Sequence, residues 1–221
     1  MISVVPSKRD LTGACTDSLV QVREVLEDAS GAVRSIEIDP ATDADVRLAH
    51  EAGLVLVREV LQLRRPLPLD RSSSVECRPF QPGRDDEAFL RVNNRAFEWH
   101  PDQADWTDQQ LHQRMAEPWF SARGFLVHEH DGVLDAFCWT KVHPPSGEEP
   151  EMGEIYVIGV DPAAHGHGLG TEMVLAGLDH LGALGIGTAM LHVESDNHTA
   201  LRLYDRLGFH HHSSHQWWEA P

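Results

Sequence analysis

The spacing of hydrophobic residues divides the chain into alternating helical and extended segments. In the first part, residues 17–31 and 41–54 repeat apolar positions at helical spacing, and a segment with the alternation of a strand follows each of them. Glycine closes both helical segments, at Gly31 and Gly53, as it often does at helix C-termini. The pattern predicts the order helix, strand, helix, strand over residues 17–65.

A stretch rich in proline, serine and charge, residues 66–74, interrupts this pattern. Such a composition is typical of a linker, because it supplies neither helical nor strand periodicity. We therefore predict a partial N-terminal unit in residues 1–65, a linker in residues 66–74 and a second domain in residues 75–221.

The second part begins with one strand pattern and two helical patterns. Two further strand patterns are joined by a hairpin signal, Asp131-Gly132. Residues 154–162 are almost continuously apolar, which is typical of a central strand covered on both faces. A glycine-rich loop, a helix, a strand, a helix and a last strand follow. This order predicts an α/β or α+β fold with a mixed sheet flanked by helices.

Two stretches are similar to one another at an offset of 155 residues. "DVRLAHEAGL" (45–54) and "ALRLYDRLGF" (200–209) share arginine, leucine and glycine at matching positions, and the flanking elements follow in the same order. Tyr204 in the second stretch stands where the first has Ala49. We therefore predict an internal repeat, of which only the second copy can use this tyrosine in chemistry.

Charge and composition exclude several classes of function. The 221-residue chain has a formal net charge of −17, and so acidic a body repels the phosphate backbone of nucleic acid. Its three cysteines, Cys15, Cys77 and Cys138, are far apart, which fits a reduced cytoplasm better than a disulfide framework. No apolar run approaches the ~18 residues of a membrane span, and the N-terminus lacks the order of a signal peptide. We expect a cytoplasmic protein that binds neither nucleic acid nor membrane.

The segment "HGHGLG" (165–170) has the composition of a phosphate-binding turn. Its glycines permit close backbone approach, and the helix that follows offers unpaired N–H groups to an anion. A pyrophosphate held in this way would suit an acidic protein. A plain strand-to-helix turn is one alternative. Zinc at His165 and His167 is the other, but their spacing and the lack of a neighbouring carboxylate or cysteine cluster argue against it.

This loop, preceded by "VDPAA" and followed by "ESDNHTALRLYDRLGF", resembles the acetyl-CoA site of the GNAT family of N-acetyltransferases. His165 stands where the family loop carries glutamine or arginine. The resemblance covers about residues 75–218 and implies the GNAT fold, with acetyl-CoA as cosubstrate and no metal. It implies acetyl-CoA contacts at Ile158, Gly159, Val160, His165, Gly166, His167, Gly168, Leu169, Gly170, Thr171, Asn197, His198, Thr199, Ala200, Leu201 and Arg202.

Four longer blocks resemble one branch of that family: "RVNNRAFEWHPDQADWT", "FCWTKVHP", "GEIYVIGVDPAA" and "VESDNHTALRLYDRLGF". This branch acetylates the cysteinyl amine of cysteinyl-glucosaminyl-inositol, in the last step of mycothiol biosynthesis. Its members carry two tandem GNAT units, and residues 1–65 resemble only the closing half of the first. We expect a shortened relative, or a coding region that begins further upstream. A monomer is expected, and a dimer is the alternative that would cover the sheet edge of the half unit.

The resemblance also implies catalytic roles. Glu154 matches the family's base, which we expect to act through a water, and Tyr204 matches the acid that protonates the CoA sulfur. Strand alternation would place Glu154 on one face with Tyr156, Ile158 and Val160. The structural alternatives are a solvated carboxylate at the strand end and a core tyrosine.

Four residues match the family's contacts to the acceptor: Asp102, Lys141, Glu154 and His192. Asp102 is one methylene shorter than the family's glutamate, and His192 replaces a tyrosine. Trp99 and Trp139 would form the floor of the pocket or pack in the core. The terminal histidines of "HHHSSHQWW" are expected to alternate faces in a strand rather than to bind a metal.

Two other functions remain open. One is a GNAT enzyme for another small-molecule amine or for a protein N-terminus. The other is a non-catalytic acyl-CoA-binding module that has lost half of its first unit. Retention of both Glu154 and Tyr204 favours an enzyme.

Overall fold

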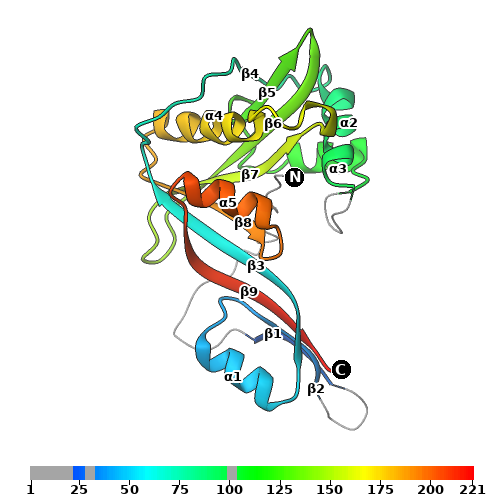
Figure 1. Cartoon of the computed structure of the whole chain (residues 1–221), viewed down its shortest axis with the longest axis vertical. Helices are drawn as coiled ribbons and strands as arrows, with labels where there is room; N and C mark the ends of the chain where they lie inside the picture. The colour runs from blue at the N-terminus through cyan, green and yellow to red at the C-terminus, as the bar shows by residue number, and fades with distance from the viewer. Residues whose placement is uncertain (1–21, 28–32, 99–103) are drawn as a thin grey trace.

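A computed structural model of the chain, which describes residues 22–27, 33–98 and 104–221, contains one mixed nine-stranded sheet (Figure 1). The strand order is β1-β2-β9-β3-β8-β7-β6-β5-β4, and all neighbours are antiparallel except β7 and β8. The strands are β1 (Val22–Glu27), β2 (Val33–Ile38), β3 (Val55–Pro66), β4 (Arg78–Pro79), β5 (Phe125–His130), β6 (Val133–His143), β7 (Met152–Val160), β8 (Thr188–Glu194) and β9 (His210–Glu219). The helices are α1 (Asp43–Glu51), α2 (Asp86–Ala96), α3 (Asp108–Met115), α4 (Leu169–Ala183) and α5 (His198–Arg206), with 3-10 turns η1 (Ala122–Gly124) and η2 (Pro162–Ala164). None of the described helices is long and apolar enough to cross a membrane.

One predicted helix is wrong. Within residues 17–31, the described residues Val22–Glu27 form strand β1, which pairs antiparallel with β2. The apolar residues Val22, Val25 and Leu26 have helical spacing, but a segment of six residues is too short for this spacing to determine the element. Residues Val22–Glu27 form a strand because the outer edge of β2 offers them a row of backbone hydrogen-bonding groups.

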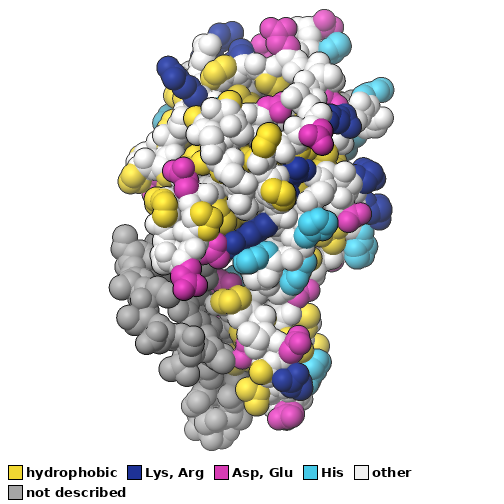
Figure 2. Space-filling view, turned by 90° about the vertical axis from the view of Figure 1, so that its left-hand side faces the viewer, with side chains coloured by type: hydrophobic (Ala, Val, Ile, Leu, Met, Phe, Trp, Pro, Cys, Tyr) yellow, Lys and Arg dark blue, Asp and Glu magenta, His cyan; other side chains and the backbone are white. Residues whose placement is uncertain are grey.

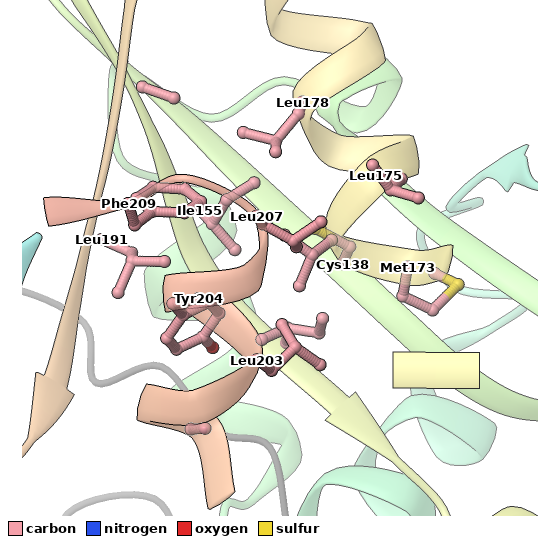
Figure 3. Packing of buried hydrophobic residues seen from close by; sticks show 14 of the residues in the cluster. Cys138, Ile155, Met173, Leu175, Leu178, Leu191, Leu203, Tyr204, Leu207 and Phe209 are labelled. Carbon is pink, nitrogen blue, oxygen red and sulfur yellow. The ribbon is translucent and has the colours of Figure 1, made fainter. Parts of the chain in front are cut away.

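The helices cover the upper part of the sheet from both faces. One core lies under α4 and α5 and includes Ile155 of β7 and Leu203 of α5 (Figure 3). A second, aromatic core lies on the other face under α2 and α3 and includes Phe89 and Trp139. A smaller third core joins α1 to the lower end of the sheet. Strand β7 is buried along its whole length, as its apolar run predicts.

The predicted repeat extends to backbone geometry. Gly53 and Gly208 have φ angles of 76° and 77° and follow α1 and α5. The N–H of Leu54 donates to the carbonyl of Ala49, and the N–H of Phe209 donates to the carbonyl of Tyr204, both at 3.0 Å. The same helix, left-handed glycine and strand therefore occur twice.

The strand that follows each of these helices pairs with strands of the other unit. β3 follows α1 but lies between β9 and β8, and β9 follows α5 but lies between β2 and β3 (Figure 1). Leu63 pairs with Leu191, and Trp218 pairs with Ile36, which is the same register at an offset of 155 residues. Residues Val55–Pro66 thus supply a strand next to β8 in the sheet that carries β7, and β9 covers the inner edge of β2.

The proline- and serine-rich segment 66–74 is held along α4. The backbone N–H of Ser73 donates to Asp179 at 2.9 Å, and that of Ser74 donates to Glu172 at 2.6 Å. Arg71 pairs with the same Glu172 at 2.7 Å. The segment predicted as a linker therefore contacts the second unit along its path.

Acidic side chains are spread over the surface. On the face drawn in Figure 2, the described acidic, basic and hydrophobic side chains are interspersed, without a continuous basic patch among them. This distribution agrees with the excess of acidic over basic residues, 35 against 18.

Candidate active site

The central strand β7 and its parallel neighbour β8 separate soon after they meet. Their ladder joins Gly153–Ile155 to Ala189–Leu191, and no later pair is recorded between them although both strands continue. Backbone groups of β7 beyond Ile155 that point toward β8 are therefore not used by this ladder. A ligand arm can take their place as hydrogen-bond partner.

A β-bulge lies at the same point. The register of β7 on β6 shifts between the pairs Trp139–Val157 and Thr140–Ile155, which leaves Tyr156 as the extra residue. Beyond the bulge, Ile158 and Val160 pack in the core under α4, whereas Tyr156 packs in the aromatic core.

The expected common face for Glu154, Tyr156, Ile158 and Val160 is therefore wrong for the last two. An extra residue in a strand moves every later side chain to the opposite face.

The glycine loop opens onto free space at the start of α4. Gly166 and Gly168 have φ angles of 91° and 78°, and a Cβ added to either would meet no atom within 4 Å. Gly168 is the N-cap of α4 and provides no side-chain acceptor for the first N–H groups of the helix. The loop therefore combines open space with unused backbone donors, which is what an anionic group requires.

Three histidines of the chain's two histidine-rich segments, His165, His211 and His215, have hydrogen-bond partners within the protein. Nε2 of His165 donates to the carbonyl of Val160 at 3.0 Å, which ties the loop to the end of β7. His215 on β9 contacts Glu37 at 2.6 Å, and side chains along β9 alternate in burial. Among the described residues, three possible metal ligands converge only at Asp86, Asp108 and His112 on α2 and α3.

Glu154 lies fully buried between two imidazoles. Its Oε2 is 2.7 Å from Nε2 of His143, its Oε1 is 2.9 Å from Nδ1 of His192, and its side chain is 0% exposed. Burial alone would raise the pKa of the Glu154 carboxyl, but the hydrogen bonds that it accepts from His143 and His192 outweigh burial and lower the pKa below its usual value. The carboxylate thus stays ionised at neutral pH, and the alternative of a solvated strand end is wrong.

The other acceptor contacts implied by the resemblance lie around Glu154 or outside the described residues. His192 bonds to Glu154, and Lys141 stands opposite it on β6. The Lys141 ammonium lies 4.7 Å from the ring centre of Trp119, a residue that the sequence analysis missed. Asp102 and Trp99 lie outside the described residues.

Trp139 packs in the aromatic core. Its ring stacks on Phe125 with centroids 4.3 Å apart, and the residue is 0% exposed. This is the core alternative that the sequence left open for this residue. His143 was missed altogether, although its position two residues after Lys141 on the same strand was a usable signal.

Tyr204 is buried on the opposite face of the sheet from Glu154. It is 0% exposed, packs against Phe209, and lies in the core under α4 (Figure 3). Its hydroxyl has no hydrogen-bond partner among the described residues. Burial, and then the nearby Cys138 thiol, raises the pKa of the Tyr204 phenol above its usual value. The phenol therefore remains a proton donor at neutral pH.

The start of α5 contributes mainly backbone. The Asn197 side chain caps the helix by accepting from the N–H of Ala200 at 3.1 Å. Ala200 is buried, whereas His198, Thr199 and Arg202 are exposed. Contacts of these residues with acetyl-CoA stay a prediction.

Gly168→Ala is expected to weaken acetyl-CoA binding roughly tenfold, because its methyl would enter the open space beside the first N–H groups of α4. The left-handed conformation also costs alanine about 1 kcal/mol. Gly185→Ala is the matched control, since Gly185 has a φ angle of 84°, an equally open surrounding and a position beyond the other end of α4. Calorimetric titration should show weaker binding for the first variant only, and equal weakening in both would contradict the assignment.

Comparison with known proteins agrees with this geometry. The model of the acetyltransferase (GNAT) family matches residues 93–209. A mycothiol acetyltransferase of Acidimicrobium ferrooxidans is 45% identical over 93% of this chain and 68% of its own length. That of Rhodococcus erythropolis is 47% identical over 76% of this chain, and the match spans 59% of the relative.

Solved structures share the fold. A GCN5-related N-acetyltransferase from Sphaerobacter thermophilus aligns with a TM-score of 0.61 at 19% identity, over 80% of this chain and 56% of that one. A GNAT acetyltransferase from Colwellia psychrerythraea aligns with a TM-score of 0.62 at 14% identity, over 86% and 66%. The chain belongs to the acetyltransferase (GNAT) family, in which the mycothiol acetyltransferases are its relatives.

Proposed function

We propose that this protein transfers the acetyl group of acetyl-CoA to the cysteinyl amine of cysteinyl-glucosaminyl-inositol. The observation that carries the proposal is the pair of groups at the point where β7 and β8 separate. On one face is the ionised, buried Glu154, and on the other is the protonated Tyr204, whose hydroxyl has no partner among the described residues. Identities of 41–49% to proteins named mycothiol acetyltransferase support the choice of acceptor.

The glycine loop and the start of α4 would hold the pyrophosphate of acetyl-CoA. Their left-handed glycines and open surroundings fit such a group. The free backbone groups of β7 would bind the pantetheine arm, and one N–H would stabilise the negative charge that develops on the thioester oxygen. Acetyl-CoA supplies the activated acyl group, so the protein needs no metal in this scheme.

The side chains then move protons. Glu154 provides the negative charge that favours removal of a proton from the acceptor amine, and Tyr204 donates a proton to the departing sulfur. Lys141 and His192, which flank Glu154, would bind the polar acceptor, and Asp102 stays a predicted contact. We place this activity in a cytoplasmic monomer.

Incubation of the purified chain with acetyl-CoA and the cysteinyl acceptor tests the proposal, with free CoA separated by chromatography because the acceptor has its own thiol. We expect CoA release that depends on this acceptor. Release only with other amines, such as an aminoglycoside or a peptide N-terminus, would indicate a different substrate. Binding of acetyl-CoA without release would indicate a non-catalytic module.

A further inference from the structure

Glu154 is closed off from direct contact with an incoming amine. Its side chain is 0% exposed, and each of its oxygens contacts one imidazole nitrogen. The two histidines are partly accessible, at 23% for His143 and 15% for His192. A proton that reaches this carboxylate from an acceptor therefore has to pass through an imidazole.

His192 is held in one tautomer by a chain of hydrogen bonds from β3. Nε of Arg64 lies 2.7 Å from Oε1 of Gln62, and an arginine can only donate, so this end of the amide is the oxygen. The amide nitrogen of Gln62 then faces Nε2 of His192 at 3.1 Å. That ring nitrogen must accept, which leaves the ring proton on Nδ1, where it points to Glu154.

This arrangement disfavours a proton on Nε2 of His192. A second proton on its Nε2 would face the N–H of Gln62, and both groups would then be donors without an acceptor. Arg64 is itself fixed by two bonds to Glu149, of 2.7 and 3.1 Å, so the amide cannot easily turn over. His192 therefore orients Glu154 but does not accept a proton.

His143 has no such restriction. Its Nε2 donates to Glu154, and among the described residues no hydrogen bond is recorded for its Nδ1. The charged or titratable groups around it are Glu154 on β7, His192 on β8 and Lys141 on its own strand. An imidazole with one nitrogen on a carboxylate, and with no partner recorded for the other among the described residues, has the arrangement of a general base.

We propose that Nδ1 of His143, rather than a water, takes the proton from the acceptor amine, and that Gln62 of the half unit excludes His192 from this role. The inference rests on the proposed acetyl transfer. The ammonium gives one proton to Nδ1, and the freed lone pair forms the C–N bond as the C–S bond breaks. The thiolate takes the proton of Tyr204, and the second proton lost by the nitrogen restores the phenol through solvent.

His143→Gln tests the proposal, since glutamine can still donate to Glu154 but cannot accept a proton. We expect kcat to fall by about 10²- to 10⁴-fold near neutral pH, with acetyl-CoA binding unchanged. An α-amine has a pKa near 8, so raising the pH from about 7 to about 9 supplies free amine and should recover roughly tenfold of the loss. A structural role would give no such recovery.

His128→Gln is the matched control. His128 lies 2.6 Å from Asp135, and the two side chains are 16% and 17% exposed, so the variant removes a similar imidazole–carboxylate pair outside the site. We expect wild-type turnover from it. Turnover of His143→Gln within a few fold of the wild type, or a loss that is equal at all pH values, would overturn the proposal.

A second measurement does not depend on turnover. Long-range ¹H–¹⁵N NMR of histidine-labelled protein, assigned by comparison with His143→Gln, should show neutral His143 protonated at Nε2 and neutral His192 protonated at Nδ1. A neutral His143 with its proton on Nδ1 would overturn the inference even if the wild type turned over no substrate. Wild-type inactivity with correct tautomers would count against the proposed function alone.

Discussion

Glu154→Gln is expected to lower kcat by roughly 10²- to 10⁴-fold while acetyl-CoA still binds normally. The substitution keeps the size of the side chain but removes the buried negative charge on which His143 and His192 converge. Without that charge, the imidazole of His143 is not stabilised when it takes a proton from the amine. The acetyl-CoA loop lies elsewhere, so the dissociation constant should not change. Steady-state kinetics and calorimetric titration measure the two quantities separately.

Asp135→Asn is the matched control for this change. Asp135 also forms a carboxylate–histidine pair, with His128, but it lies on β6 next to Ala136, which pairs with Val160 at the other end of β7 from Glu154. Its kcat should stay close to that of the wild type. If Glu154→Gln retained turnover within about fivefold, or altered KM alone, the role of Glu154 in proton removal would be wrong.

Tyr204→Phe is expected to lower turnover without lowering the free energy of unfolding. The hydroxyl is buried without a partner among the described residues, and such a group costs a folded protein about 1–3 kcal/mol. Its removal should therefore leave the free energy of unfolding unchanged or raise it by about 1 kcal/mol. Turnover should fall by about 10²-fold or more, because the leaving sulfur loses its proton donor. Denaturant unfolding and kinetics on the same preparation provide both values.

Leu178→Met serves as the control in the same core. Leu178 is 1% exposed on α4, and the change conserves volume, so both stability and turnover should change little. Loss of acetyl-CoA binding in Tyr204→Phe, in proportion to the loss of turnover, would instead make Tyr204 a structural residue.

The sequence alone predicts those elements that are determined by a short stretch of neighbouring residues. Asp131 and Gly132, the predicted hairpin signal, adopt the positive φ angles of a tight hairpin. The buried strand β7 was evident from its continuous apolar run. In each case one short stretch of chain contains the whole physical reason for the structure.

The rest depends on partners far away in the sequence. β3 has the same pattern whether it pairs with its own unit or with β8, so periodicity cannot reveal the exchange. The bulge at Tyr156 is a property of the β6–β7 ladder and reverses the faces of Ile158 and Val160. His143 becomes part of the site only because the β6–β7 register brings it to Glu154.

The position of β3 between β8 and β9 indicates what the N-terminal part of the chain contributes to the site. β3 covers the edge of β8 that would otherwise be open, and it brings Gln62 to His192. The degenerate copy lacks a counterpart of Tyr204, since Ala49 stands at that position. We therefore expect its contribution to catalysis to be a strand and a positioning amide.

The central claim is that acetyl is transferred to an amine nitrogen at the point where β7 and β8 separate. Its most direct test is the structure of the product from wild-type protein, acetyl-CoA and the cysteinyl acceptor, determined by mass spectrometry and NMR after a rapid quench. We expect one acetyl amide on the cysteinyl nitrogen, with a free cysteinyl thiol, for each CoA released. An acetyl group on sulfur alone, or no acetylated product from protein that binds acetyl-CoA, would contradict it.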